Sequence, residues 1–295
     1  MNFENAPRKA FRAEFFCETE EKFYAGSCGI LTKSILGEDI HYYKFGRGKS
    51  NLLFVGAHHS MEHITASVLY EIIAKISENL RRDKSFCGVN LKFWLQKFTF
   101  WFIPCLNPDG IDLFFGDSKN NVLYERQVKM NGGEDFFAWQ ANARGVDLNH
   151  NYDFGFSEYK LIEKEKKITP GKTAYSGEYP ESEPESRALA NLVRVIRPSL
   201  IVSLHSQGKE IFYRPRESAR VRRIAERCAE ILDYRVSLPQ GGADFGGLSD
   251  YAGENLGIPS LTVEVGLGKN PLPDGARRAI AEGVMKLVYL LPAQL

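Results

Sequence analysis

Short apolar runs alternate with amphipathic stretches along the chain, and this alternation constrains the fold more than any other feature. The runs have the length of buried strands, and the stretches between them repeat apolar residues at helical spacing. This order predicts an α/β fold, in which a central mixed, mostly parallel β-sheet is flanked by helices on both faces. The predicted strands are 40–45, 52–55, 98–103, 200–204 and 261–265.

Four apolar stripes with helical spacing predict four helices that cover this sheet. The second should begin at Ser182, because Pro184 and Glu185 complete a capping-box pattern there. Between the helices, residues 112–142 read as a long irregular loop of the kind that forms lids and pocket walls. The charged run 163–167 reads as a solvated face. The predicted helices are 64–80, 182–198, 221–232 and 276–290.

The length and composition fit one large domain, with residues 1–295 forming the domain and 1–39 an N-terminal extension packed on or leading into it. The chain is 43% hydrophobic and 25% charged, which allows a sizeable core. A net charge of +1 gives no bulk attraction to nucleic acid or to anionic membranes, so we expect neither as a partner. The oligomeric state is unknown from the sequence.

The cysteines and the N-terminal residues indicate a cytoplasmic protein. Five cysteines are scattered along the chain without zinc-knuckle spacing, and their odd number favours free thiols in a reducing compartment. The first residues contain no apolar run of signal-peptide length, and no later segment approaches the ~18 apolar residues of a membrane span.

One short segment carries three of the six histidines, and it can be read as two different metal motifs. His59, Glu62 and His63 match H-x-x-E-H, the inverted zincin motif, in which both histidines bind zinc and the glutamate activates water. The same letters match H-x-x-E, in which His59 and Glu62 are both ligands. A third interpretation is a polar surface at the start of a helix.

The local context favours H-x-x-E. The predicted strand 52–55 ends at Gly56, which places His59 in the strand-to-helix turn and Glu62 in the first helical turn. Ligands at the carboxyl end of a strand face the crevice where α/β sheets bind ligands. This reading requires a third ligand at the end of another strand, and His205 follows the predicted strand 200–204 directly. Two histidines and one glutamate are a known catalytic zinc set.

Several segments, taken in order, resemble the zinc carboxypeptidase family, and together they cover residues 52 to about 273. The resemblance implies one Zn²⁺ ion held by His59, Glu62 and His205, with Glu264 as general base and acid. It also implies that Asp147 orients the imidazole of His59, as such carboxylates do in metal sites. The matching segments are GAHHSME, NPDG (107–110), NARGVDLNHN (142–151), LHSQG (204–208) and LTVEVG (261–266).

The same resemblance assigns two further roles in amide hydrolysis. Asn149 would bind a carboxylate or the backbone of the substrate, and Arg144 would stabilise the oxyanion. The chemistry is consistent with these residue types, because zinc lowers the pKa of a bound water to roughly 7 and polarises the carbonyl. A carboxylate such as Glu264 takes the water proton and passes it to the leaving amine.

Departures from the family pattern narrow the expected substrate. His150 stands where the family has an arginine that grips a free C-terminal carboxylate, and histidine cannot form that bidentate clamp. The family's phenolic tyrosine aligns with glycine, near Gly241 or Gly242. The segments HSQGKEIFY, GLGKNPLP and 175–189 resemble the bacterial γ-D-glutamyl-meso-diaminopimelate peptidases. Arg214 and Arg216 are candidates for anchoring such a substrate.

Three functional hypotheses follow. The favoured one is a zinc metallopeptidase that acts in the cytoplasm on small peptides derived from the cell wall. The second is a zinc carboxypeptidase or an acyl-amino-acid deacylase of the same fold. The third is a non-catalytic binding protein, which is disfavoured because every metal ligand and the candidate base are present.

Overall fold

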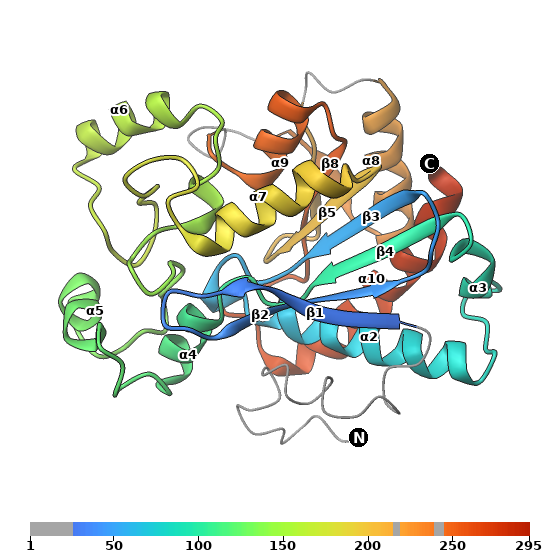
Figure 1. Cartoon of the computed structure of the whole chain (residues 1–295), viewed down its shortest axis with the longest axis horizontal. Helices are drawn as coiled ribbons and strands as arrows, with labels where there is room; N and C mark the ends of the chain where they lie inside the picture. The colour runs from blue at the N-terminus through green and yellow to red at the C-terminus, as the bar shows by residue number, and fades with distance from the viewer. Residues whose placement is uncertain (1–25, 215–218, 239–244) are drawn as a thin grey trace.

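The computed structural model describes residues 26–214, 219–238 and 245–295, and it contains one eight-stranded mixed sheet (Figure 1). The strand order across the sheet is β1-β2-β4-β3-β5-β8-β6-β7. The strands are β1 (Gly26–Lys33), β2 (Asp39–Phe45), β3 (Ser50–Val55), β4 (Phe98–Ile103), β5 (Leu200–His205), β6 (Glu210–Phe212), β7 (Arg235–Ser237) and β8 (Ser260–Glu264).

The centre of the sheet is parallel, and antiparallel pairs occur toward its edges. Strands β4, β3, β5 and β8 run parallel to one another, whereas β1, β2 and β4 pair antiparallel and β6 runs antiparallel to β8. The predicted fold class is therefore confirmed. All five predicted strands are present, and the predicted bounds of β4 are those observed. Strand β1 pairs along the whole of β2, so the stretch from Gly26 onward is part of the sheet.

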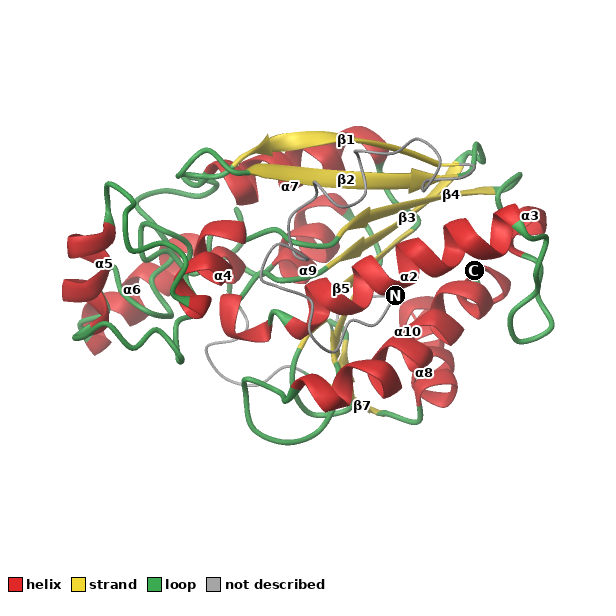
Figure 2. Cartoon of the chain, turned by 90° about the horizontal axis from the view of Figure 1, so that it is seen from below, coloured by secondary structure: helices red, strands yellow, loops and turns green. Residues whose placement is uncertain are grey.

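Helices cover both faces of the sheet, as expected. Buried residues of α2, α8 and α10 form one core with one sheet face, and these three helices lie beside one another in Figure 2. Buried residues of α7 and α9 form a second core on the other face. The helices are α2 (Ile64–Arg81), α3 (Leu91–Trp94), α4 (Pro108–Phe115), α5 (Tyr124–Asn131), α6 (Phe156–Lys166), α7 (Pro184–Ile196), α8 (Ala219–Leu232), α9 (Leu248–Asp250, followed by a π-helical turn at Tyr251–Asn255) and α10 (Arg277–Leu290).

Three local predictions are wrong. Helix α7 begins at Pro184 with Glu183 as its N-cap, and no side chain caps it, because Ser182 Oγ donates to the Glu183 carboxylate instead. The segment 112–142 is not one irregular loop, since it contains the end of α4 and all of α5. The run 163–167 is not wholly solvated, because Glu163 is buried and accepts hydrogen bonds from the Ser176 amide and Lys160 Nζ.

Within the part of the chain that is described, no helix is long and apolar enough to cross a membrane. The assignment of residues 1–295 to one domain stays a prediction, and residues 1–25 of the expected extension lie outside the described residues.

The NPDG segment is the start of α4, and its asparagine ties three loops together. Asn107 is fully buried, and its Oδ1 accepts from the Gly110 amide at 3.0 Å to cap the helix. Its Nδ2 donates to the carbonyls of His58, Gln140 and Ala141 at 3.1, 3.2 and 3.0 Å. Gly110 must be glycine because a Cβ there would lie 2.6 Å from the Ala141 carbonyl. This one amide therefore fixes the turn that carries His58 and its neighbours.

We expect Asn107→Ala to lower the free energy of unfolding by about 2–4 kcal/mol, because it removes a helix cap and leaves buried carbonyls unpaired. Urea unfolding of the metal-free protein measures this. The matched control is Asn191→Ala on the exposed surface of α7, which should change stability by less than about 0.5 kcal/mol. Equal effects of the two substitutions would contradict the role given to Asn107.

Candidate metal centre and active site

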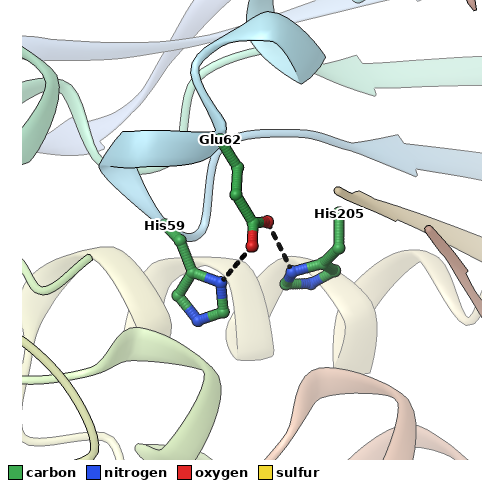
Figure 3. A group of neighbouring side chains, drawn as sticks. All are labelled: His59, Glu62 and His205. Carbon is green, nitrogen blue, oxygen red and sulfur yellow. Dashed lines mark hydrogen bonds and ion pairs between the residues drawn. The ribbon is translucent and has the colours of Figure 1, made fainter. Parts of the chain in front are cut away.

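Three side chains from two distant segments meet at the carboxyl edge of the sheet. One ligand atom from each of His59, Glu62 and His205 lies within 4.8 Å of the other two. The Glu62 carboxylate lies between the imidazoles, with Oε1 3.2 Å from His59 Nδ1 and Oε2 3.0 Å from His205 Nδ1 (Figure 3). The arrangement brings together the three residues that the H-x-x-E reading selects.

The backbone around β3 explains how His59 and Glu62 reach this position. Strand β3 ends at Val55, and Gly56 passes close to β4, where a Cβ would lie 2.7 Å from the Pro104 carbonyl. His59 is in an extended conformation at the N-cap of a 3-10 turn, Ser60–Glu62, and α2 begins at Ile64. The predicted strand-to-helix turn is therefore confirmed, except that Glu62 lies in the 3-10 turn before the helix.

His63 lies apart from this group. Its ring packs against Phe114 and Phe115, with ring centroids 5.0 and 4.8 Å away. Among the residues that the structure describes, the one group of His, Cys, Asp and Glu able to hold a metal is His59, Glu62 and His205. The geometry therefore disfavours the inverted zincin motif, which needs His59 and His63 on one metal.

The surroundings of the group suit a metal ion such as zinc. His59 Nε2 lies 3.1 Å from Asp147 Oδ1 and donates to it, so Nδ1 is the nitrogen that faces Glu62 and would bind a metal. His205 Nε2 is buried without a hydrogen-bond partner. Two imidazole nitrogens and one carboxylate oxygen are a zinc donor set that leaves a position open for water or substrate.

The electrostatics of the group explain why it favours a cation. Burial alone would raise the pKa of Glu62, but His59 and His205 outweigh it and lower that pKa to about 2. Burial alone would lower the pKa of His59, but Glu62 and Asp147 raise it well above its ordinary value. The two carboxylates thus stabilise positive charge at this point in the protein interior.

Glu264 is the last residue of β8 and lies beside the group. In the parallel register of β5 and β8, Glu264 is the partner of His205, so both side chains point to the same face. Burial raises the pKa of Glu264 well above its ordinary value, and the charge of Glu62 adds to this effect. A buried carboxyl whose pKa is raised in this way is a candidate general acid and base.

A pocket of about 590 Å³ opens in front of these residues. Five carboxylates line it, and no lysine or arginine belongs to the lining in the described ranges. Asn149 and His150 also line the pocket. The carboxylates are those of Glu62, Asp147, Glu210, Asp250 and Glu264.

Comparisons with known proteins agree with this geometry. The profile described as zinc carboxypeptidase matches residues 25–286. The chain belongs to the zinc carboxypeptidase family.

Among characterised relatives, the chain is 27% identical over 250 residues to γ-D-glutamyl-L-diamino acid endopeptidase 1 of Lysinibacillus sphaericus. That match covers 82% of this chain and 61% of the relative, so the chain spans less than two thirds of the relative's length.

Solved structures share the fold. Thrombin-activatable fibrinolysis inhibitor superposes with a TM-score of 0.70 at 18% identity, covering 93% of this chain and 70% of that one. The murein-tripeptide amidase of Escherichia coli O157 superposes with a TM-score of 0.54 at 18% identity, covering 91% and 95%.

Other predicted site residues of this zinc carboxypeptidase lie as follows. Asn149 Oδ1 accepts from the Leu248 amide at 3.2 Å, so its amide NH₂ is the group available to a substrate. His150 Nδ1 donates to the Phe245 carbonyl at 2.8 Å, and its ring stacks on Tyr159 with centroids 4.2 Å apart. Both residues are therefore held in place on the pocket wall.

Of the three predicted arginines, Arg144 and Arg214 are described, and neither lines the pocket. The Arg144 side chain is half exposed and its Nη1 lies 3.7 Å from Glu183 Oε2, so the expected oxyanion role has no geometric support here. Arg214 is buried, donates from Nε to Asp250, and lies over the Phe154 ring, so it reaches the pocket only through Asp250. Arg216, Gly241 and Gly242 lie outside the described residues.

The sequence analysis did not select several polar residues of the pocket wall, and two of them, Gln140 and Glu210, matter most for the site. Gln140 lies beside the turn that carries His59 and Glu62, and it lines the pocket. Its Oε1 accepts a hydrogen bond from Thr173 Oγ1 at 2.5 Å, and its Nε2 lies 3.1 Å from the Met61 sulfur. Glu210 lies on β6 and also lines the pocket. The only sequence signal for Glu210 was its place in the short strand after His205, and Gln140 carried no signal because it lies in a loop.

We expect His205→Ala to abolish tight zinc binding, because it removes one of the three ligands whose ligand atoms lie within 4.8 Å of one another. His63→Ala should keep a full equivalent of zinc. Metal analysis by mass spectrometry after dialysis measures both, with circular dichroism to check folding. Retention of zinc by His205→Ala together with loss by His63→Ala would restore the H-x-x-E-H reading.

Proposed function

We propose that the chain hydrolyses the amide bond between γ-D-glutamate and a diamino acid in small peptides derived from peptidoglycan. His59, Glu62 and His205 hold one zinc ion in this proposal, and Glu264 is the general base and acid. The observation that carries it is the cross-strand pairing of Glu264 with His205 at the wall of the pocket.

Zinc bound in such a site supplies a Lewis acid that acidifies water and polarises the scissile carbonyl. Asp147 keeps the proton on His59 Nε2, which leaves Nδ1 free to bind. Glu264 accepts a proton from the attacking water as the new C–O bond forms. It then donates that proton to the leaving nitrogen as the C–N bond breaks, so the carboxylate is regenerated and no charge is left over.

The pocket supports a peptide substrate of a particular kind. Its volume lies within the range typical of small-molecule sites. His150 offers an imidazole that is already bonded to Phe245 and stacked on Tyr159, so it cannot act as a bidentate clamp for a C-terminal carboxylate. Asn149 supplies an uncharged donor instead. The choice of bond is supported by the relative named γ-D-glutamyl-L-diamino acid endopeptidase 1.

Another zinc carboxypeptidase activity on ordinary peptides, or deacylation of an acyl-amino acid, is the alternative within the same fold. We also propose a cytoplasmic location. It is supported by Cys87, Cys105 and Cys228, which form no disulfide with one another in the described residues, as expected in a reducing compartment.

We expect Glu264→Gln to keep zinc and to lose about 100- to 10,000-fold in kcat, because glutamine can hydrogen-bond to water but cannot accept its proton. Kinetics on the best substrate and metal analysis of the same sample measure this. Near-normal turnover of Glu264→Gln would move the general base elsewhere.

The substrate proposal predicts a clear order of activities. L-Ala-γ-D-Glu-meso-diaminopimelate and its L-lysine counterpart should be cleaved at the γ-glutamyl bond, and a hippuryl-type carboxypeptidase substrate should be cleaved poorly. Liquid chromatography with mass spectrometry on the zinc-loaded protein measures all three. If the hippuryl substrate had the highest kcat/KM, the proposed bond would be wrong.

A further inference from the structure

Four neighbouring strands carry one row of side chains away from the candidate zinc site. His205 on β5 pairs with Glu264 on β8, Glu264 pairs with Glu210 on β6, and Glu210 pairs with Arg235 on β7. Residues that pair directly across strands point to the same face of a sheet. The four side chains therefore follow one another along the face that carries the pocket.

A second row lies beside the first and confirms the direction. Thr262, Phe212 and Ser237 are successive partners across β8, β6 and β7, and all three line the pocket. The pocket wall thus continues past Glu264 onto the short strands β6 and β7. Glu210 occupies the middle of this extension.

Glu210 lines the pocket, and its carboxylate is held by Arg235 and Ser237 on β7. Its Oε2 lies 2.7 Å from Arg235 Nη2, and its Oε1 accepts from Ser237 Oγ. The Arg235 side chain is 69% exposed and does not line the pocket, whereas that of Glu210 is 13% exposed and does. Gly208 lies next to both acidic residues, since a Cβ on it would be 3.6 Å from the Cβ atoms of Glu210 and Glu264.

The Glu210 carboxylate can accept further hydrogen bonds from a cation. An ionised carboxylate offers about four lone-pair positions, and Arg235 and Ser237 occupy two of them. Hydrogen bonding from Arg235 lowers the pKa of Glu210, so the group is charged at neutral pH. The described pocket lining contains no lysine or arginine that would neutralise it.

We propose that Glu210 is a specificity-determining residue that binds the distal ammonium group of the diamino acid. This inference rests on the proposed function. Two strand spacings separate the backbones of His205 and Glu210, which is about 10 Å. A four-carbon chain spans roughly 6 Å when extended, so an amine at its end reaches toward Glu210 while the scissile bond is at the metal site. A charge-assisted hydrogen bond then selects diamino acids over neutral residues of equal length.

Two peptides that differ by one amino group test this. L-Ala-γ-D-Glu-L-lysine and L-Ala-γ-D-Glu-L-norleucine have the same carbon chain, and only the first has the ammonium. The wild-type enzyme should prefer the lysine peptide by roughly 10- to 100-fold in kcat/KM. Glu210→Gln should remove most of this preference, which is read as the ratio of kcat/KM for the two peptides measured with the same variant.

Binding provides a readout that does not depend on turnover. In the Glu264→Gln background, calorimetry should show tighter binding of the lysine peptide than of the norleucine peptide. Adding Glu210→Gln to that background should make the two dissociation constants equal.

Arg235→Gln is the matched control. It breaks the same ion pair but leaves the carboxylate, so the preference for lysine should persist. If Glu210→Gln and Arg235→Gln slowed both peptides equally, Glu210 would only clamp β6 to β7 and the inference would be overturned. If the wild-type enzyme cleaved both peptides equally well, this inference would fail and the proposed function would stand. If the wild-type enzyme cleaved neither peptide, both this inference and the proposed function would be overturned.

Discussion

The alignment of three parallel strands is the constraint on which the site depends. Strands β3, β5 and β8 are hydrogen-bonded side by side in register, so their carboxyl ends reach the same edge of the sheet. The turn after β3 carries His59 and Glu62, β5 ends at His205, and β8 ends at Glu264. A slip of one residue in β5 or β8 would turn His205 or Glu264 to the opposite face. The buried apolar residues on both faces of the sheet hold the register and therefore hold the site.

The cost of burying charged groups explains the composition of the site. Glu62 and Asp147 are both buried, and each is stabilised by imidazole groups rather than by solvent. Glu264 lies next to them with less compensation, so its pKa rises instead of falling. The same buried surroundings thus lower the pKa of two carboxyls, Glu62 and Asp147, and raise that of the third, Glu264. A divalent cation would complete the charge balance of this group.

The charge of the described pocket lining is the basis of the proposed preference for a substrate that carries an amine. That lining contains carboxylates, amides and hydroxyls, whereas Arg144 and Arg214 pair with Glu183 and Asp250 and do not line the pocket. A guanidinium that would grip a free C-terminal carboxylate is absent from the described lining. In the proposal, the choice of substrate therefore depends on the short strands β6 and β7 rather than on His150.

The sequence by itself determined the α/β class, the central strands and the candidate metal ligands. The spacing of apolar residues that marks a strand or a helix is a local property of the sequence. A metal ligand directly after an apolar strand can likewise be recognised from the residues next to it in the sequence. The tertiary structure decided which polar residues meet. Asn107, Gln140 and Glu210 act through partners far along the chain, and the Arg144 side chain lies beside Glu183, a contact that sequence spacing in a loop could not indicate. Strand pairing is a non-local property, so the row from His205 to Glu210 appears only once the sheet has formed.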